Sequence, residues 1–302
     1  MPELPEVQTV VDDLNRKVAG RTIAGLWFDW PKALKDPLDQ QRDEIAHAYV
    51  ETFKKTVIGK KILRAERRAK NILIRLSGGY LMLVHQKMTG HLLVGKWGIE
   101  NGKPVPIEPK EMVEDSYNGY IHLIFYLDDG RMLALSDLRK FAKVLLGTAE
   151  QIENLKELTE LGPEPLDPKF RFAAFKKIIL GERRKIKQVL MDPSVIAGIG
   201  NIYSDEIAWR ACVHPFRPAN QINGKELKTM FAAMKAVLKQ AIKLRGTSFG
   251  DFRDTAGKRG LFGDVRKVYG RERKPCPRCT TAIVRQKIGG RSAHFCPRCQ
   301  IL

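Results

Sequence analysis

The 302-residue sequence lacks a long apolar run, a lipid-attachment motif and a basic amphipathic anchor. A membrane-spanning helix needs about 20 consecutive, mostly apolar residues, and stable surface attachment needs a lipid or an anchoring helix. The amino terminus also lacks a basic region followed by an apolar segment, so no signal peptide is expected. These absences predict a cytoplasmic protein without a membrane partner.

Cysteine is scarce, with five residues in the chain. A reducing compartment favours thiols or metal ligands over disulfides. Cys276 and Cys279, and then Cys296 and Cys299, form two C-x2-C pairs separated by 16 residues, which is typical of a four-thiolate zinc site. Such a site has no open coordination position, so we expect one structural Zn²⁺ that stabilises a small module. The alternative is four unliganded core cysteines. Cys212 has no partner in sequence and is expected to be core packing.

Acidic residues are few relative to basic ones: 34 Asp and Glu against 53 Lys and Arg, a formal charge of +19. The excess is concentrated in residues 54–75 and in residues 253–302, where 13 basic side chains face 3 acidic ones. Charge alone would suit nucleic acid or an anionic membrane. Because no membrane anchor is found, nucleic acid is favoured.

Apolar periodicity predicts a β-rich half followed by a helical half. Val7, Val10, Val11, Leu14 and Val18 repeat at helical spacing before Gly20. "NILIRL" and "YLMLVH" flank "SGG", and "YIHLIFYL" and "RMLAL" flank "DDG", so two hairpins are expected. The polar, proline-containing segment 95–118 is interpreted as a loop insertion. Later helices are predicted around residues 172–179, 186–190 and 227–242.

These patterns predict an α+β multidomain chain without internal repeats. The expected divisions are a β-sandwich with flanking helices (1–148), a linker containing "LGPEPLDP" (149–168), a helical domain (169–246), a mobile glycine-rich loop (247–270) and a cysteine module (271–302).

The start "MPELPEV" places two prolines before the first helix. Helix punctuation is the simple interpretation, since proline fits a first helical turn. The other is catalytic. Removal of Met1, which the small second residue permits, would leave Pro2 as a terminal secondary amine with a pKa near 8. Such an amine can attack an electrophilic sugar carbon and form an imine, while Glu3 moves a proton.

Several further residues have two interpretations each. Met88 in "HQKMTGHL", and Arg139 and Phe141 in "LRKFAK", follow strands and could replace an extruded base, or could fold back onto the core. Asn201, after two glycines in "AGIGNIYSDEIAW", could cap a helix or bind a phosphate. Arg291 in "GGRSAH" could bind a phosphate from a hairpin tip or be solvated.

Taken together, the sequence resembles the formamidopyrimidine-DNA glycosylase family, bacterial repair enzymes related to endonuclease VIII. Five segments in order carry the resemblance: "PELPEV", "RRAKNILI", "LGPEPL", "AGIGNIYSDEI" and "VYGRERKPCPRC…GGRSAHFCPRC". The resemblance implies an N-terminal β-sandwich, a helix-two-turn-helix domain and a C-terminal zinc-finger β-hairpin. It also implies a monomer in the bacterial cytoplasm, associated with the nucleoid, that binds double-stranded DNA containing oxidised bases or abasic sites.

The resemblance further implies roles for individual residues. Pro2 would attack C1′ and Glu3 would donate a proton, with Lys70 near the active-site phosphates as a third catalytic residue. The implied DNA-binding residues are His85, Met88, Arg139, Phe141, Asn201 and Arg291. The implied activity is release of 8-oxoguanine and formamidopyrimidines, followed by strand cleavage through β,δ-elimination.

The sequence departs from the family in two places. "DLRKFA" stands where the family usually has "DPRRFG", with Leu138 in place of proline and Ala142 in place of glycine. The loop "GTSFGDFRDTAGKRGLFG", where the family recognises damaged purines, also differs. Three alternatives therefore stay open: an endonuclease VIII-like enzyme for oxidised pyrimidines, against which "PELPEV" argues, a non-enzymatic lesion-binding protein and a zinc-ribbon RNA-binding protein.

Overall fold

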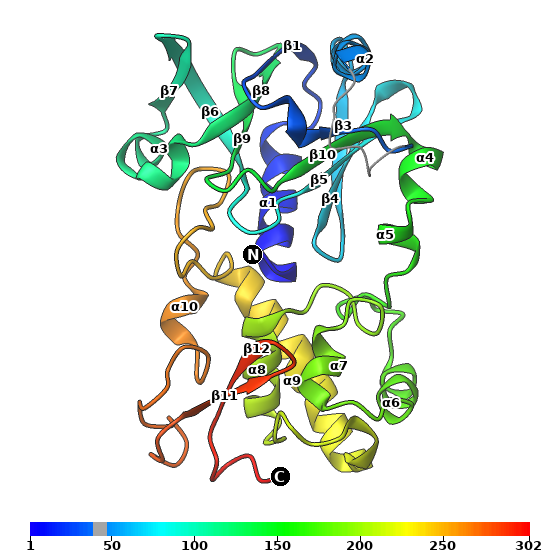
Figure 1. Ribbon diagram of the computed structural model, residues 1–302, viewed down its shortest axis with the longest axis vertical. Coiled ribbons are helices and arrows are strands. Elements are labelled where there is room, and N and C mark those ends of the chain that lie inside the picture. The colour runs from blue at the N-terminus through cyan, green and yellow to red at the C-terminus, as the bar shows by residue number, and fades with distance from the viewer. Residues whose placement is uncertain (39–46) are drawn as a thin grey trace. The chain divides into compact units, whose positions relative to one another are not determined.

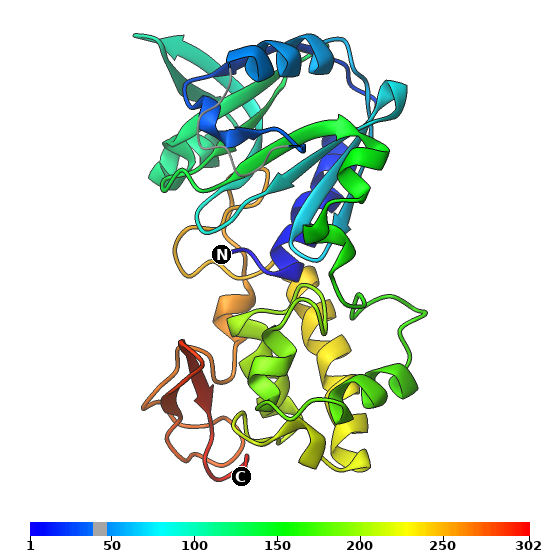
Figure 2. The same cartoon turned by 45° about the vertical axis from the view of Figure 1, so that its right-hand side comes forward.

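The computed structural model describes residues 1–38 and 47–302, which form two compact units. Unit 1 contains Met1–Thr159 and Arg245–Leu261, and unit 2 contains Glu160–Leu244 and Phe262–Leu302. Figures 1 and 2 show the chain in two views. The five divisions expected from sequence are finer than these two units, so their boundaries stay predictions.

Two five-stranded sheets make up most of unit 1. The first has the order β1 (Ile23–Phe28), β8 (Ile121–Leu127), β9 (Met132–Ser136), β6 (His91–Glu100) and β7 (Lys103–Glu108). The second has the order β2 (Leu34–Lys35), β10 (Lys143–Thr148), β5 (Tyr80–His85), β4 (Asn71–Leu76) and β3 (Ile62–Arg68). Strand β2 pairs with β10 in parallel. Strands β4 and β5, and β8 and β9, are antiparallel neighbours, which confirms both predicted hairpins.

One apolar cluster joins the two sheets and helix α1 (Leu4–Lys17). Alternate residues of each strand point into it, such as Leu123 and Phe125 of β8 and Ile72 and Ile74 of β4. Helix α1 adds the apolar stripe expected from its helical spacing, including Val7. Short helical elements flank the sheets: η1 (Pro31–Ala33), α2 (His47–Val57), η2 (Ser77–Gly79), α4 (Ala149–Glu153) and α5 (Lys156–Thr159). The predicted β-sandwich is confirmed.

The interpretation of residues 95–118 as a loop is wrong. Strand β6 continues to Glu100 and pairs with β7, and α3 (Lys110–Glu114) and η3 (Ser116–Gly119) follow. Pro104 and Pro106 lie on β7, an edge strand, where a missing N–H is tolerated. The prolines obscured the strand, whereas the dipeptide Asn101-Gly102, with both residues at positive φ, is the signal of a two-residue hairpin turn.

Unit 2 is helical and ends in a two-stranded sheet. Its elements are α6 (Phe172–Leu180), α7 (Ile186–Met191), α8 (Asn201–Arg210), η4 (Ala219–Gln221), α9 (Gly224–Lys243), α10 (Phe262–Val265), β11 (Val284–Ile288) and β12 (Arg291–Phe295). The predicted helices are confirmed, and α10 adds a short helix inside the expected 247–270 loop. Within residues 1–38 and 47–302, no helix combines the length and apolarity that a membrane crossing requires.

Candidate functional site

Residues 2–6, near the start of the chain, are buried within unit 1, where Glu6 meets the loop of residues 245–261. Glu3 is the N-cap of α1 and only 3% exposed. Glu6 accepts the Glu3 backbone N–H at 2.8 Å and, through its other oxygen, the Thr247 N–H at 2.7 Å. Pro5 lies in the first helical turn, which is the punctuation expected. The preference of proline for the first helical turn therefore explains Pro5. It does not explain Pro2, which precedes the N-cap residue.

The terminal amine lies among charged groups. Burial lowers the pKa of the Met1 amino group; Glu3, Glu6 and Asp251 act in the opposite direction, and Lys70 lowers this pKa further. An amine with a lowered pKa has a larger unprotonated, nucleophilic fraction at neutral pH. Side chains from three parts of the sequence, residues 3–6, 70 and 251, thus act electrostatically on the amino group of Met1.

Lys70 occupies the tight turn between β3 and β4. Its neighbour Ala69 is in the left-handed region at φ +52. The Arg67 guanidinium donates to the Ala69 carbonyl at 3.0 Å and to the Gln8 side chain on α1 at 2.9 Å. The turn that carries Lys70 is therefore held against the helix that begins beside Glu3.

His85, at the end of β5, is a neutral imidazole with a fixed tautomer. Burial is the main cause that lowers its pKa to about 3, with the cations of Lys87, Lys143 and Lys70 adding to the effect. Its Nδ1 accepts the Lys87 backbone N–H at 3.0 Å. The proton must then reside on Nε2, which leaves that N–H as a hydrogen-bond donor.

Acidification is expected to destabilise the protein through His85. The folded state excludes a proton that the unfolded chain binds below pH 6.5, so stability falls as pH drops from 6.5 toward 3. Between pH 7 and pH 5 this group alone should remove about 2 kcal/mol of unfolding free energy. Urea unfolding at the two pH values measures the loss, and His85→Gln should show a correspondingly smaller one. An equal loss in both proteins would contradict the assignment.

One buried carboxylate holds the two loops that carry Met88, Arg139 and Phe141, called the wedge residues here because the sequence predicts that they replace an extruded base. Asp137, which is fully buried, accepts the Thr89 hydroxyl and the backbone N–H groups of Phe141 and Ala142, the latter two at 2.7 Å. The Arg139 N–H donates to Thr89 Oγ1 at 3.0 Å and to Asp137 at 3.2 Å. The loops after β5 and β9 are therefore joined to each other. Sequence reasoning missed this role, because nothing local distinguishes Asp137 from a surface aspartate.

The wedge residues themselves are exposed rather than folded onto the core. Phe141 is 51% exposed, and Met88 is 38% exposed. The Arg139 guanidinium lies 4.6 Å from the centre of the Phe141 ring, a cation–π contact. Exposed apolar side chains fixed on rigid loops suit contact with a partner.

A hollow of about 560 Å³ is lined both by the start of the chain and by these loops. It is lined by Met1, Trp30, Lys32, Lys35, Lys87, Met88, Lys140, Phe141, Ala142 and Lys143. Lys87 and Lys140 have φ values of +54 and +57, a conformation that strains any residue other than glycine. Five of the lining residues are lysines, and most of the others are apolar. This combination suits a polyanion that also carries aromatic groups. The segment with Trp30, Lys32 and Lys35 was missed because its residues are ordinary in sequence and gain meaning only from this neighbourhood.

In unit 2, Asn201 is the first residue of α8, after Gly200 as the N-cap. The interpretation of Asn201 as a cap is therefore wrong. Its Nδ2 lies 3.4 Å from the Tyr269 hydroxyl, while its buried Oδ1 has no partner among the described residues. Glu206, on the same helix, accepts the N–H groups of Lys267, Val268 and Tyr269 at 2.9–3.0 Å. That carboxylate fixes the Tyr269 segment beside Asn201.

Arg291 is exposed at the tip of the β11–β12 hairpin, directly after Gly289 and Gly290 at positive φ. A Cβ atom at Gly289 would lie 2.6 Å from the Gln188 side chain of α7, so the tip packs closely on the helices. At the hairpin's other end, buried Asp205 of α8 accepts the His294 N–H at 2.8 Å.

The same Asp205 forms an ion pair with fully buried Lys187 of α7 at 2.5 Å. Lys187 also donates to Ser204 at 3.2 Å. A buried charge pair with its hydrogen bonds satisfied specifies geometry. These contacts hold the β11–β12 hairpin, which carries Arg291, against helix α8, which begins at Asn201.

The four predicted metal ligands lie together in unit 2. The sulfurs of Cys276, Cys279, Cys296 and Cys299 are within 4.8 Å of one another. A tetrahedral zinc with bonds near 2.3 Å places its sulfurs about 3.8 Å apart. Backbone N–H groups of Arg278 and Cys299 approach the sulfurs of Cys276 and Cys296 at 3.5 and 3.4 Å, the bonds a thiolate accepts. The donor set fits one closed, structural Zn²⁺ site.

Removal of zinc is expected to unfold the hairpin module rather than inhibit chemistry directly. Four thiolates at these distances repel one another without a cation, and the module's apolar cluster is small. Chelation, or Cys296→Ser, should weaken the DNA binding expected from the sequence at least about tenfold, through loss of the hairpin. Fluorescence anisotropy with and without a chelator measures this, with added zinc restoring binding. Unchanged binding by a metal-free protein would contradict the structural role.

Comparisons with known proteins decide the family. The formamidopyrimidine-DNA glycosylase N-terminal domain matches residues 1–144, the H2TH domain of the same glycosylase matches residues 161–253, and the zinc finger found in FPG and IleRS matches residues 273–301. The formamidopyrimidine-DNA glycosylase of Pelotomaculum thermopropionicum is 38% identical over 300 residues, 99% of each chain. The protein belongs to the formamidopyrimidine-DNA glycosylase family. The helix-two-turn-helix domain and zinc finger expected from sequence are confirmed.

Solved structures agree with this membership. Lactococcus lactis Fpg in complex with abasic-site DNA is similar with a TM-score of 0.83 and 28% identity, covering 99% of this chain and all of that one. MutM (Fpg) of Thermus thermophilus gives a TM-score of 0.80 and 31% identity, covering 99% and 98%. Similarity at this coverage extends over both units rather than one shared module.

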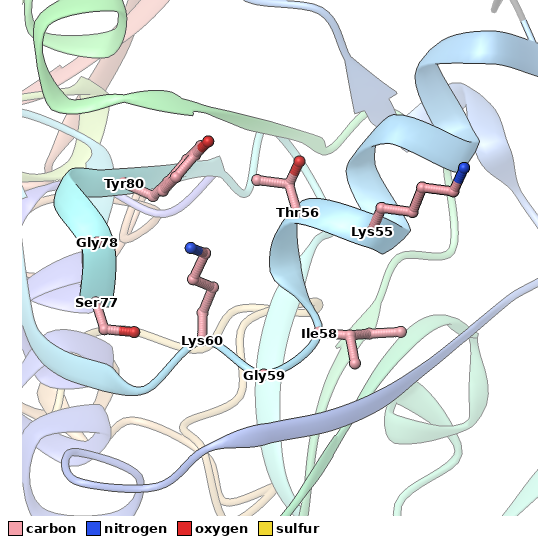
Figure 3. A pocket seen from close by; sticks show the side chains of 8 residues that line it. All are labelled: Lys55, Thr56, Ile58, Gly59, Lys60, Ser77, Gly78 and Tyr80. Atoms are coloured by element: carbon pink, nitrogen blue, oxygen red, sulfur yellow. The ribbon is translucent and has the colours of Figure 1, made fainter.

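Two further features, Cys212 and a second hollow in unit 1, are not part of the site described above. Cys212, expected in the core, is exposed at φ +57 after α8, because the chain reverses there, and its sulfur lies 2.8 Å from the Arg278 guanidinium. A second hollow of unit 1, between the end of α2 and the β4–β5 turn, contains Lys55, Lys60 and Tyr80 (Figure 3). It includes no predicted site residue. Lys60 there lies 4.4 Å from the centre of the Tyr80 ring.

Proposed function

We propose that this protein is a bifunctional DNA glycosylase and AP lyase of base-excision repair that excises oxidised purines, chiefly 8-oxoguanine and formamidopyrimidines. Family membership supports the glycosylase activity, and the observation that supports the mechanism is buried Glu3 directly after Pro2, hydrogen-bonded to Glu6, with Asp251 and Lys70 among the charges that act on the Met1 amine one residue ahead of Pro2. We further propose that it works as a monomer in the bacterial cytoplasm, associated with the nucleoid through DNA.

The chemical step begins when Met1 has been removed and the Pro2 amine is free. Its lone pair attacks C1′ of the damaged nucleotide, and the bond from C1′ to the base breaks as Glu3 protonates the departing base. The bond from C1′ to the ring oxygen then breaks, that oxygen takes the proton lost by the Pro2 nitrogen, and an iminium at C1′ remains. The resulting iminium acidifies the 2′ hydrogens. Proton loss there expels the 3′-phosphate, and a second elimination expels the 5′-phosphate, which cleaves the strand by β,δ-elimination.

Pro2 can reach C1′ only when the damaged nucleotide leaves the stack. Met88 and Phe141, exposed on the loops held by Asp137, would fill the space, and Arg139 would contact the opposite base. His85 would donate its Nε2–H to a backbone phosphate, and Lys70 would neutralise another near the amine. Asn201 and Arg291, in unit 2, would bind phosphates beside the lesion.

Borohydride trapping tests this proposal. The protein is mixed with a duplex containing one 8-oxoguanine opposite cytosine, and with a matched duplex containing an oxidised pyrimidine. A covalent adduct mapped to the Pro2 peptide, formed faster on the purine lesion, would support enzyme class, nucleophile and substrate together. Faster trapping on the pyrimidine would move the enzyme to the endonuclease VIII specificity. Tight lesion binding by a processed terminus without any adduct would make it a non-enzymatic damage binder.

Arg291→Gln is expected to weaken DNA binding and flatten its dependence on salt. Removal of one phosphate interaction should reduce the slope of log K against log salt concentration by about 0.9. Lys55→Gln, in the hollow of Figure 3, removes the same charge from an exposed position of unit 1 and should leave the slope unchanged. Titrations at several salt concentrations measure both. Equal changes in the two variants would mean that Arg291 acts only through net charge.

A further inference from the structure

The segment of residues 103–119, which contains β7, α3 and η3, packs on the loop of residues 245–261 within unit 1 (Figure 1). The Arg253 guanidinium, 3% exposed, donates to Asp115 at 2.6 Å and lies 4.8 Å from the centre of the Tyr117 ring. Asp115 also accepts the Tyr117 N–H at 3.1 Å, and these bonds hold the pKa of its carboxyl below the usual range despite desolvation. Asp115 is therefore an oriented anion that fixes Arg253.

Arg253 passes this constraint on to the tip of the loop. The same guanidinium donates through Nη1 to the carbonyls of Gly250 and Phe252, at 2.6 and 2.8 Å. Asp251 lies between those two residues and is one of the charges that act on the terminal amine. The tip that approaches the amine is thus positioned by an arginine whose own position depends on Asp115.

A second attachment lies a few residues further along the loop. Asn118, fully buried, donates to the Gly257 carbonyl at 3.3 Å and to the Glu111 carbonyl at 3.1 Å. Gly257 has φ +80, and a Cβ atom there would lie 2.6 Å from the Asn118 amide. Lys258 pairs with Glu111 at 2.8 Å on the surface.

The two stems of the loop are fixed on α1 instead. Asp13 accepts the Thr255 hydroxyl at 2.8 Å and pairs with Arg245, and Glu6 accepts the Thr247 N–H. The tip, residues 248–252, therefore lies between two anchored stems. Through Arg253, the Asp115 carboxylate ties this tip to the segment of residues 103–119.

We propose that Asp115, through Arg253, is a positioning residue for recognition of the extruded damaged base. The inference rests on the proposed function and on the family resemblance, which implies that this loop recognises the damaged base. An abasic site has no base for the tip to hold, so strand cleavage at a preformed abasic site needs only Pro2 and the phosphate contacts. Displacement of the tip should therefore slow excision of a damaged base much more than it slows cleavage at an abasic site.

Asp115→Asn tests the inference, since it keeps an acceptor for the Tyr117 N–H but removes the charge that holds Arg253. Arg253→Lys is the second variant, because it keeps the charge but cannot reach Asp115 and both carbonyls together. Glu108→Gln is the matched control: Glu108 pairs with Lys96 at 2.8 Å in the same segment, and both side chains are about half exposed.

The readout is kcat/KM for 8-oxoguanine excision divided by kcat/KM for cleavage at an abasic site, with Tm measured for each protein. We expect this ratio to fall about tenfold or more in Asp115→Asn and Arg253→Lys, since small misplacements of binding groups have effects of this size. The control ratio should not change. A constant ratio, or equal losses on both substrates together with a lower Tm, would overturn the inference. A wild-type protein that excises no oxidised purine would instead overturn the proposed function itself.

Discussion

A variant with an extra leucine between Met1 and Pro2 is expected to lose base excision and strand cleavage together, by at least about a thousandfold. The bulky second residue prevents removal of Met1, and the Pro2 nitrogen then stays in an amide, whose lone pair is delocalised into the carbonyl. No other group at the site is proposed to form the imine. Single-turnover cleavage of 8-oxoguanine and abasic duplexes, with mass spectrometry of the terminus, measures the loss.

Pro2→Gly provides the matched control, because Met1 is still removed and a free amine, now primary, occupies the same place. It should remain trappable by borohydride, although more slowly. DNA affinity of the leucine variant, measured on an uncleavable abasic analogue, should stay within about tenfold of wild type, since phosphate contacts dominate binding. Strand cleavage that persists in the leucine variant would show that another side chain is the nucleophile.

Glu3→Gln is expected to separate the two activities. Excision of a damaged base should fall about 10²- to 10⁴-fold, the usual contribution of a positioned proton donor. Cleavage at a preformed abasic site should fall far less, because no base remains to be protonated. Glutamine has nearly the same shape and keeps an oxygen that can accept the Glu6 N–H of the capping box, so α1 should still begin in the same place.

Glu51→Gln controls for removal of a negative charge, since Glu51 is exposed on α2 and its carboxylate pairs with Lys54 of the same helix at 3.2 Å. It should leave both activities unchanged. If Glu3→Gln reduced excision and abasic cleavage by the same factor, Glu3 would be assigned to positioning the amine rather than to proton transfer.

Local patterns were sufficient for most of the fold. Val7, Val10 and Leu14 repeat every three to four residues, and they form the buried face of α1. Alternation in "YIHLIFYL" predicted β8 because one face of that strand meets the core. Strand β7 was missed, since Pro104 and Pro106 are rare in strands and an edge position that tolerates them is a property of the assembled sheet.

The candidate site was predictable only where a residue type is unusual for its place. A proline at position 2 and paired cysteines have few structural reasons to occur, so they were visible in the sequence. Asp137 and Asp115 are ordinary aspartates in polar segments. Their roles come from Thr89 and Arg253, partners that the fold brings to them from 48 residues away for Asp137 and 138 residues away for Asp115. The sequence around each aspartate does not reveal which distant residue it will contact.

The left-handed backbone at Lys87 and Lys140 has an evolutionary consequence. Glycine at either position would relax the backbone by about 1 kcal/mol or more, so a population selected only for heat tolerance should drift toward glycine there. Each such change would also remove a cation from the hollow beside Phe141. Selection for thermal stability and selection for a cationic hollow should therefore act in opposite directions at these two positions.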